Sequence, residues 1–120
     1  MKKILLVEDD TFMQDIVSQK LLEASFDIKI VARGDEAVAT VSDYQPDLIL
    51  LDIDLPGKNG FTILQELRAT DTTTPVIIFS NDDDPDNKQK AKELGAQDFY
   101  FKAYTGTDEL LAKIQEHLPQ

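Results

Sequence analysis

The strongest structural signal in this 120-residue chain is the stretch PDLILLDIDLPGKNG, residues 46–60. Within it, the aliphatic run Leu48–Leu51 is followed at once by Asp52. A run without polar alternation is typical of a strand that helices cover on both faces. The turn-forming residues that follow lead to Gly60 and then to a segment with helical spacing. The stretch therefore predicts a strand, a loop and a helix of an α/β fold.

Similar runs of aliphatic or aromatic residues recur on both sides of this strand, at Ile4–Val7, Ile28–Val31, Val76–Phe79 and Phe99–Phe101. Apolar residues at helical spacing separate the runs, in residues 13–24, 37–41, 60–67, 91–94 and 110–118. Gly95 stands where a helix commonly stops, and Thr105 and Thr107 are candidate caps for the last helix. The pattern predicts a doubly wound parallel sheet with helices on both faces, in one domain spanning residues 1–120.

Composition and charge argue against several functional classes. The net charge is −11, whereas a nucleic-acid-binding protein needs a basic face. The chain has no cysteine, which excludes disulfides, thiolate zinc sites, iron–sulfur clusters and cysteine nucleophiles. The first apolar run, Ile4–Val7, is too short for a signal peptide or a membrane-spanning helix. We therefore expect a cytoplasmic domain that binds neither nucleic acid nor membrane.

Acidic residues follow three of the predicted strands. They are Glu8, Asp9 and Asp10, then Asp52 and Asp54, then Asp82, Asp83, Asp84 and Asp86. The carboxyl ends of parallel strands meet at one edge of the sheet, where ligands of such folds bind. The ordinary polarity of loops accounts for Asp83, Asp84 and Asp86, and Asp10 is also suited to cap the following helix.

Three of these acids, Glu8, Asp9 and Asp52, would come together if the first and third strands are neighbours. Unit charges about 5.5 Å apart repel by roughly 3 kcal/mol per pair at an effective dielectric near 20. Such a cluster calls for a cation, and carboxylates without histidine favour Mg²⁺ or Mn²⁺ over zinc. Lys102 ends the fifth strand and Ser80 the fourth, at the same edge. An acidic cluster, a metal, an amine and a hydroxyl together predict a site for a phosphoryl group.

In this arrangement the chain resembles the receiver domain of two-component response regulators over essentially its whole length. The resemblance rests on the first strand with its acidic pair (residues 4–10), on the D-x-x-L-P-x-x-x-G pattern from Asp52 to Gly60, and on residues 32–37, 75–80 and 95–99. It implies a flavodoxin-like sheet with strand order 2-1-3-4-5. It also implies either a stand-alone regulator similar to the chemotaxis regulators or a piece of a longer protein.

The resemblance also implies roles for individual residues. Asp52 matches the phospho-acceptor, which takes its phosphoryl group from a histidine kinase or a histidine phosphotransfer protein. Glu8, Asp9 and the backbone carbonyl of Asp54 match the family's contacts to Mg²⁺. Ser80 and Lys102 match the groups that contact the attached phosphoryl, and Phe99 matches the switching aromatic residue. The result would be a signalling domain that catalyses its own phosphorylation and dephosphorylation, with the fourth helix, fifth strand and fifth helix facing a downstream partner.

Departures from the family pattern leave alternatives open. Ala103 stands where the family usually has a proline after a cis peptide bond, so the isomer of the Lys102–Ala103 bond is not determined. Asn81 stands where a very small residue is preferred. Both favour a pseudo-receiver that acts as an interaction module without phosphorylation. The pair Asp52 and Asp54 also resembles the motif of haloacid-dehalogenase-type phosphatases, but there the motif follows the first strand rather than the third.

Two further interpretations concern the fold as a whole and its one histidine. A flavin or nucleotide carrier on the same fold would need a glycine- or hydroxyl-rich phosphate loop, whereas the loops here are acidic. His117, the single histidine, is expected to be a solvated residue that caps carbonyls at the end of the last helix.

Overall fold

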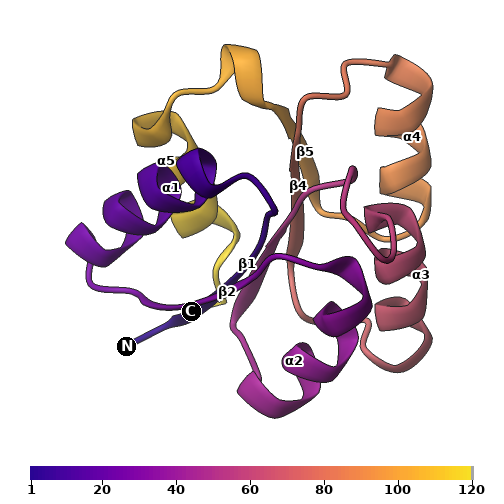
Figure 1. Ribbon diagram of the computed structural model, residues 1–120, viewed down its shortest axis with the longest axis horizontal. Helices are drawn as coiled ribbons and strands as arrows, with labels where there is room; N and C mark the ends of the chain where they lie inside the picture. The colour runs from indigo at the N-terminus through magenta and orange to yellow at the C-terminus, as the bar shows by residue number, and fades with distance from the viewer. Residues whose placement is uncertain (120) are drawn as a thin grey trace.

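Five parallel strands lie between two layers of helices in the computed structural model, which describes residues 1–119 (Figure 1). The elements are β1 (Lys3–Val7), α1 (Thr11–Glu23), β2 (Asp27–Val31), η1 (Gly34–Glu36), α2 (Ala37–Tyr44), β3 (Leu48–Leu51), α3 (Gly60–Thr70), β4 (Val76–Ser80), α4 (Pro85–Glu93), β5 (Asp98–Phe101), η2 (Lys102–Tyr104) and α5 (Thr107–His117). The strand order β2-β1-β3-β4-β5 confirms the predicted doubly wound, flavodoxin-like fold class. Within residues 1–119, no helix combines the length and the apolar character needed to cross a bilayer.

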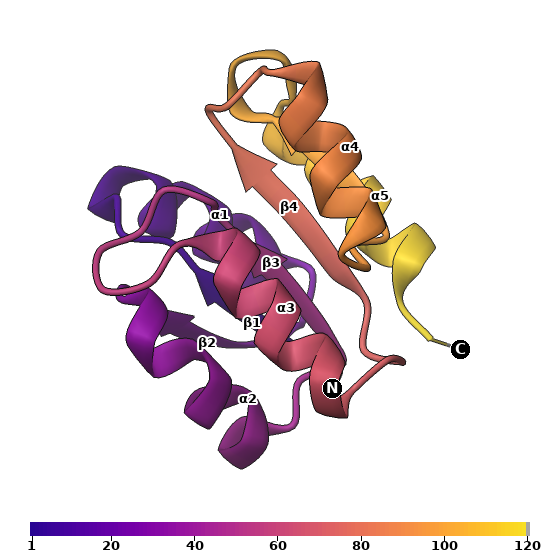
Figure 2. The same ribbon diagram turned by 90° about the vertical axis from the view of Figure 1, so that its right-hand side faces the viewer.

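The helices divide between the two faces of the sheet. Helices α1 and α5 lie on one side of it, and α2, α3 and α4 lie on the other (Figures 1 and 2). Side chains along β1 alternate between the two resulting cores, with Leu5 and Val7 in one core and Ile4 and Leu6 in the other. None of these four is more than 2% exposed. Burial on both faces is the reason that the strand sequences show no polar alternation.

The pairing of β1 with β3 brings the predicted site residues to one edge. The two strands are parallel and in a register that places Val7 opposite Leu51, so Glu8 and Asp52 both follow directly. The backbone continues the pairing there, since the Asp52 N–H donates to the Val7 carbonyl at 3.0 Å. The Glu8 N–H donates to the Val31 carbonyl of β2 at 2.9 Å. Ladder bonds therefore fix the backbone that carries both acids.

Gly60 allows α3 to begin against the end of β3. A Cβ atom at this position would lie 2.4 Å from the carbonyl oxygen of Asp52 and 2.8 Å from the Cα of Ile53. No side chain fits there without moving the backbone of the acidic residue itself. The glycine that closes the D-x-x-L-P-x-x-x-G pattern is thus a requirement of close packing at the site.

The helix ends agree with the sequence in part. Asp10 caps α1, with its carboxylate accepting from the Phe12 and Met13 N–H groups. Helix α4 ends before Gly95, which has a φ of +107°, as the sequence predicts. The prediction that Thr105 or Thr107 caps the last helix is wrong, because Gly106 occupies the N-cap position without any side-chain cap. Acidic residues in the first turn of α5 instead complement its positive end.

The connection from β5 to α5 forms the short helical turn η2, which the apolar periodicity did not indicate. Lys102 is the first residue of this turn. Residues 1–119 contain no cis peptide bond, so the bond between Lys102 and Ala103 is trans. Lys102 nevertheless reaches the edge of the sheet where the acids lie, as described next.

Candidate functional site

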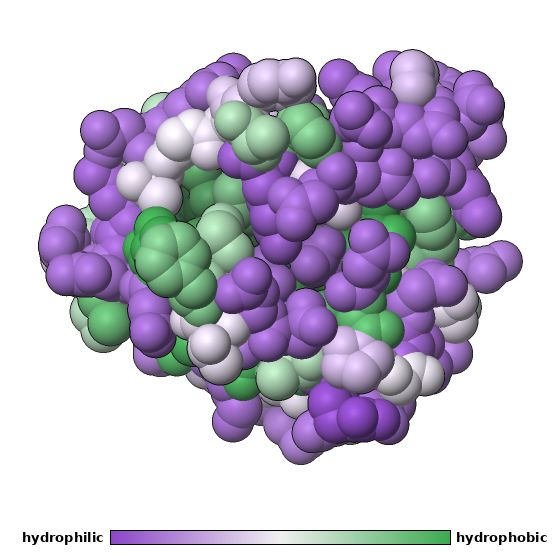
Figure 3. Space-filling view, turned by 45° about the horizontal axis from the view of Figure 1, so that its top comes forward, coloured by the Kyte–Doolittle hydropathy of each residue, from purple (hydrophilic) through white to green (hydrophobic). Residues whose placement is uncertain are grey.

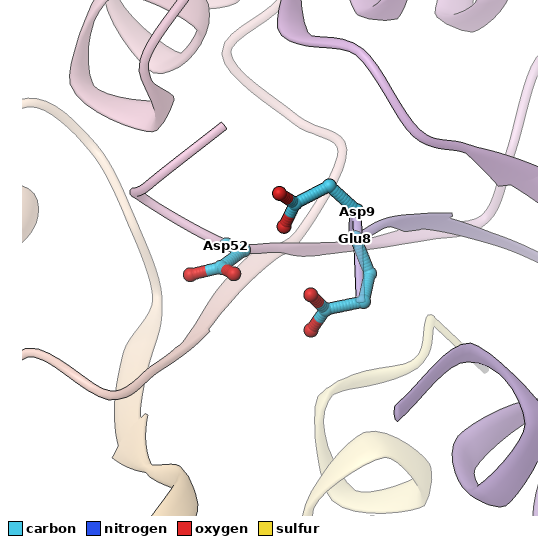
Figure 4. Close-up of side chains that lie close together, drawn as sticks. All are labelled: Glu8, Asp9 and Asp52. Atoms are coloured by element: carbon cyan, nitrogen blue, oxygen red, sulfur yellow. The ribbon is translucent and has the colours of Figure 1, made fainter. Parts of the chain in front are cut away.

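Three carboxylates meet beyond the ends of β1 and β3. Glu8, Asp9 and Asp52 each place one carboxylate oxygen so that all three oxygens lie within 4.8 Å of one another. Glu8 is only 2% exposed and Asp52 only 6%, whereas Asp9 is open to solvent. Figure 4 shows Glu8 and Asp9 on one chain segment and Asp52 on the neighbouring segment, with their carboxylates around a common space. The structure thus brings together the three acids that the sequence analysis selected.

Lys102 supplies the opposite charge to this cluster. Its Nζ lies 2.5 Å from Oε1 of Glu8 and 3.0 Å from Oδ2 of Asp52. The lysine side chain is 7% exposed, so both ion pairs are shielded from water. The ammonium also lies 5.9 Å from the ring centroid of Phe79. Lys102 therefore bridges the two buried acids across the end of the sheet.

The pKa values of Glu8 and Lys102 are shifted by burial and by charge. Burial raises the pKa of Glu8 and the charge of Asp52 adds to this, while hydrogen bonds from Lys102 and the Asp10 N–H oppose the rise. Burial alone would lower the pKa of Lys102, but the carboxylates of Glu8 and Asp52 outweigh it and raise that pKa. Lys102 consequently remains an ammonium at neutral pH, and it compensates only one of the two buried acids.

The Asp52 carboxylate is held by two donors. Its Oδ1 accepts from the Ile53 N–H at 2.7 Å, and its Oδ2 accepts from Lys102 Nζ at 3.0 Å. Glu8 is anchored similarly, since its carboxylate accepts from the Asp10 N–H at 3.2 Å and its carbonyl from the Gln14 side chain at 2.6 Å. Each carboxylate thus accepts one backbone hydrogen bond, and side chains hold it further.

Ser80 and Phe99 lie on neighbouring strands beside the cluster. Ser80 ends β4, is fully buried and accepts a hydrogen bond from the Asp82 N–H at 3.2 Å, so its own hydroxyl hydrogen is left to donate. The register pairs Phe99 with Ile78 and Phe101 with Ser80. Since residues two apart along a strand share a face, Ser80 and Phe99 lie on the same side of the sheet. The hydroxyl and the aromatic ring that the sequence selected therefore face the same layer of helices.

The acidic loop after β4 is built from hydrogen bonds within itself. Asp82 accepts from the Asn87 side chain at 2.6 Å and from the Asp84 N–H at 2.9 Å. Asp84 in turn caps α4 by accepting from the Asp86 N–H at 2.9 Å. Asp82 and Asp84 thus have structural roles that the sequence alone did not distinguish. Asp54 is exposed, and its side chain is not part of the three-carboxylate cluster.

The donor set fits a hard divalent cation. The cluster offers carboxylate oxygens only, and two of its members are buried with a single ammonium between them. Mg²⁺ and Mn²⁺ prefer oxygen ligands, and a divalent charge would offset the remaining negative charge. Glu8, Asp9 and Asp52 are therefore the residues that could hold such an ion.

A hydrogen-bonded cluster around Asp98, which the sequence did not indicate, joins β5 to α5. The expectation that His117 caps helix carbonyls as a solvated residue is wrong, since its Nε2 lies 3.0 Å from Oδ2 of Asp98 and its side chain is 23% exposed. The Tyr100 hydroxyl donates to the same carboxylate oxygen at 2.5 Å. Burial acts to raise the pKa of Asp98, but the contacts from Tyr100 and His117 outweigh it and lower that pKa. No local pattern indicates a contact that depends on how α5 packs against β5.

Comparison with known proteins gives consistent matches. A family model described as the response regulator receiver domain matches residues 4–115. The transcriptional regulatory protein RstA of Escherichia coli is 38% identical over 120 residues, which cover 100% of this chain and 49% of that protein. The transcriptional regulatory protein CiaR of Streptococcus pneumoniae is 42% identical over 115 residues, which cover 96% of this chain and 50% of that protein. The chain thus spans about half the length of these curated relatives.

Solved structures show the same similarity in three dimensions. The BeF3-activated N-terminal receiver domain of Klebsiella pneumoniae RstA superposes with a TM-score of 0.93 at 35% identity, covering 99% of this chain and 100% of that one. The chemotaxis response regulator CheY4 of Vibrio cholerae gives a TM-score of 0.90 at 28% identity, covering 98% of this chain and 99% of that one.

Proposed function

The chain belongs to the response regulator receiver domain family of two-component systems, and we propose that it is a phospho-accepting switch in which Asp52 is the acceptor. The donor would be a histidine kinase or a histidine phosphotransfer protein. The observation that carries the proposal is the convergence of Glu8, Asp9 and Asp52 around one space, with Lys102 bound to the acceptor carboxylate. An exposed acidic rim without this geometry would not support it.

In the proposed reaction, an oxygen of Asp52 attacks the phosphorus atom of the donor phosphohistidine. A new O–P bond forms, the N–P bond breaks, and the leaving imidazole keeps the electron pair and takes up a proton. A carboxylate is a weak nucleophile, so the rate must come from positioning and from neutralisation of charge. The two donors on Asp52 support the positioning, because they fix the direction of its oxygens.

Mg²⁺ would be held by Glu8, Asp9 and Asp52, together with the backbone carbonyl of Asp54. When bound, it would reduce the repulsion between the carboxylates and the incoming phosphoryl group. The raised pKa of Glu8 supports this assignment, since it reflects a buried carboxylate with incomplete compensation. Mn²⁺ would serve in the same way, because it prefers the same oxygen ligands.

After transfer, the added charge would attract the Lys102 ammonium and the Ser80 hydroxyl. Ser80 is tied to the β4–α4 loop through the Asp82 N–H, so a movement of the hydroxyl would move that loop. Phe99 faces the same side of the sheet and would change its packing with the loop. We propose that the altered surface of α4, β5 and α5 then binds a downstream protein. The function would be a switched surface rather than a released product.

Intact-mass spectrometry with a small-molecule phosphodonor, acetyl phosphate, tests the proposal. We expect one added phosphoryl group on the parent protein in the presence of Mg²⁺, and little or none with EDTA or in Asp52→Asn. Asp10→Asn is the matched control, because asparagine also caps helices and this acid lies outside the carboxylate cluster. Equal labelling of the parent and Asp52→Asn would refute the assignment of the acceptor.

The alternative is a pseudo-receiver that binds partners without phosphorylation, and it rests on Ala103 and Asn81. Beryllofluoride with Mg²⁺ distinguishes the two functions, because the complex mimics a phosphoryl group on a carboxylate. A receiver that accepts phosphate should show amide shifts around Asp52, Ser80 and Lys102 in NMR spectra, and Asp52→Asn should abolish them. A parent protein that shows no such shifts, and no labelling by acetyl phosphate, would be a pseudo-receiver.

A further inference from the structure

A pocket of about 260 Å³ opens between the β4–α4 connection and the β5–α5 connection. One wall is acidic and the other is aromatic. The lining residues are Asp82, Asp83, Asp84, Pro85 and Lys88 on one side, and Phe99, Phe101 and Tyr104 on the other. In Figure 3, which brings the upper end of Figure 1 forward, apolar surface at the upper edge lies beside a broad hydrophilic area. The pocket shares no residue with the carboxylate cluster, but it includes residues of α4 and β5, so the inference rests on the proposed function of that surface.

The aromatic wall differs in exposure along its length, with Phe99 buried, Phe101 partly exposed and Tyr104 exposed. Phe101 and Tyr104 lie with their ring centroids 4.9 Å apart and their planes tilted by 51°. Tyr104 is 82% exposed and stands at the open side of this wall. Aromatic rings attract cations through their faces, so an aromatic pair at the mouth of a pocket suits a positively charged group.

The acidic wall leaves one carboxylate free. Asp82 and Asp84 are already occupied by hydrogen bonds within the loop and at the cap of α4. Asp83 is exposed and forms no hydrogen bond or ion pair with any of residues 1–119. Lys88 is the one cationic residue in the lining, so the carboxylates outnumber the positive charge. The pocket therefore combines net negative charge with an exposed aromatic side chain.

We propose that this pocket binds an arginine side chain presented by a partner protein. A guanidinium is planar, stacks on aromatic faces and pairs with a carboxylate through two parallel hydrogen bonds, which matches the wall of Phe101 and Tyr104 facing Asp83. Pockets for small molecules begin at about 300 Å³, so the volume here suits one side chain rather than a larger ligand. The net charge of −11 would also favour encounter with a basic partner.

NMR titration of the ¹⁵N-labelled protein with the peptide Ac-Ala-Arg-Ala-NH₂ at low salt tests this proposal. We expect saturable shifts of backbone amides in residues 82–88 and 99–104. The peptide with citrulline in place of arginine has the same shape without the charge, and it should bind about fivefold more weakly or worse, as loss of a cation–π contact and an ion pair implies. Shifts spread evenly over the acidic surface would overturn the proposal.

Matched variants locate the binding energy. Tyr104→Ala and Asp83→Asn should each weaken arginine-peptide binding about threefold or more, whereas Lys88→Gln should strengthen it. Phe12→Ala and Asp15→Asn remove an exposed aromatic residue and an exposed acid from α1, and they should leave the affinity unchanged. The dispersion of each variant's spectrum shows whether it is folded. Equal losses in the pocket variants and the α1 variants would overturn the assignment.

Other occupants would give different results. Equal affinity for the citrulline peptide would indicate an apolar groove without cation recognition. Shifts of the same amides on simple dilution would indicate a second copy of the chain. Displacement of the arginine peptide from Asp52→Asn by millimolar Mg²⁺, but not by NaCl of equal ionic strength, would indicate a metal site. Each of these outcomes would refute an arginine pocket.

Discussion

Removing the ammonium of Lys102 should destabilise the protein by about 3 kcal/mol at pH 7 in the absence of Mg²⁺. Lys102 Nζ lies 2.5 Å from Glu8 and 3.0 Å from Asp52. At an effective dielectric near 20, each pair attracts by about 5–7 kcal/mol before the cost of burying the ammonium is subtracted. Breaking a buried pair by deleting one partner costs about 3–5 kcal/mol. Lys102→Met keeps an unbranched apolar stem of similar length and removes the ammonium group with its two contacts.

Protonation of Glu8 sets an upper bound on this loss. A glutamate with an ordinary pKa of about 4.3 takes up a proton at pH 7 at a cost of roughly 3.5 kcal/mol, and burial already raises the pKa of Glu8. The contact with Lys102 opposes this rise, so in the variant the pKa of Glu8 would rise further, and folded Glu8 would bind a proton at a higher pH than it does in the parent. The stability of Lys102→Met should consequently rise as the pH falls from 7 to 5, and the gap to the parent should narrow by about 1 kcal/mol or more.

Urea unfolding at pH 7 and pH 5, with EDTA, measures both effects. Lys58→Met is the matched control, because Lys58 forms an exposed ion pair with Glu66 at 2.8 Å and should lose less than about 1 kcal/mol. Added Mg²⁺ should stabilise Lys102→Met more than the parent, since a divalent ion would replace the missing positive charge. A loss below about 1 kcal/mol at pH 7, or an equal loss at both pH values, would refute the view that Lys102 compensates buried charge.

Three other predictions follow from the same structure. Gly60→Ala should lower the free energy of unfolding by about 2 kcal/mol or more and abolish labelling by acetyl phosphate, because the new Cβ would lie 2.4 Å from the Asp52 carbonyl oxygen. Gly106→Ala is the control, since its new Cβ would meet open space and should cost far less stability. Equal urea midpoints for the two variants would contradict this prediction. Hydrogen bonds, first among them that from the Thr74 hydroxyl, lower the pKa of Asp71 to about 2. Asp71→Ala should therefore lose about 1 kcal/mol of stability at pH 7, and its difference from the parent should close as the pH falls from about 4 to 2. A difference that stays constant in urea unfolding over that pH range would count against this prediction. Asp54→Ala and Asp82→Ala should each change the dephosphorylation rate if these acids flank the path of the hydrolytic water, and rates within about twofold of the parent would remove that hypothesis.

The sequence predicts the sheet well because the central strands of this fold are continuous apolar runs. Burial on both faces leaves the run Leu48–Leu51 without a single polar residue. The place of this strand in the chain, and the helices that must cover both of its faces, therefore follow from its composition alone. The acids at positions 8, 9 and 52 were predictable for the same reason, since each stands directly at the end of such a run. Once the ends of the strands are predicted, the residues of the site are predicted with them.

Contacts made by side chains across elements were not predictable in this way. Asp98 and His117 are 19 positions apart, and they meet only because α5 packs beside β5. The cap of α5 depends on how the β5–α5 connection turns, and Gly106 occupies the cap although two threonines flank it. Such details depend on the relative placement of elements, which periodicity does not encode.

The trans connection at Lys102 departs from the family pattern, but it leaves the ammonium beside the buried acids. The resemblance implies a proline after this lysine, and Ala103 stands there instead, within the helical turn η2. Yet the ammonium reaches both buried carboxylates. Two ion pairs with groups that are 7% exposed or less fix the end of the side chain, so the backbone does not need a proline to direct it. Ala103→Pro should therefore leave acetyl phosphate labelling intact, whereas Lys102→Met should alter it even where Mg²⁺ restores stability.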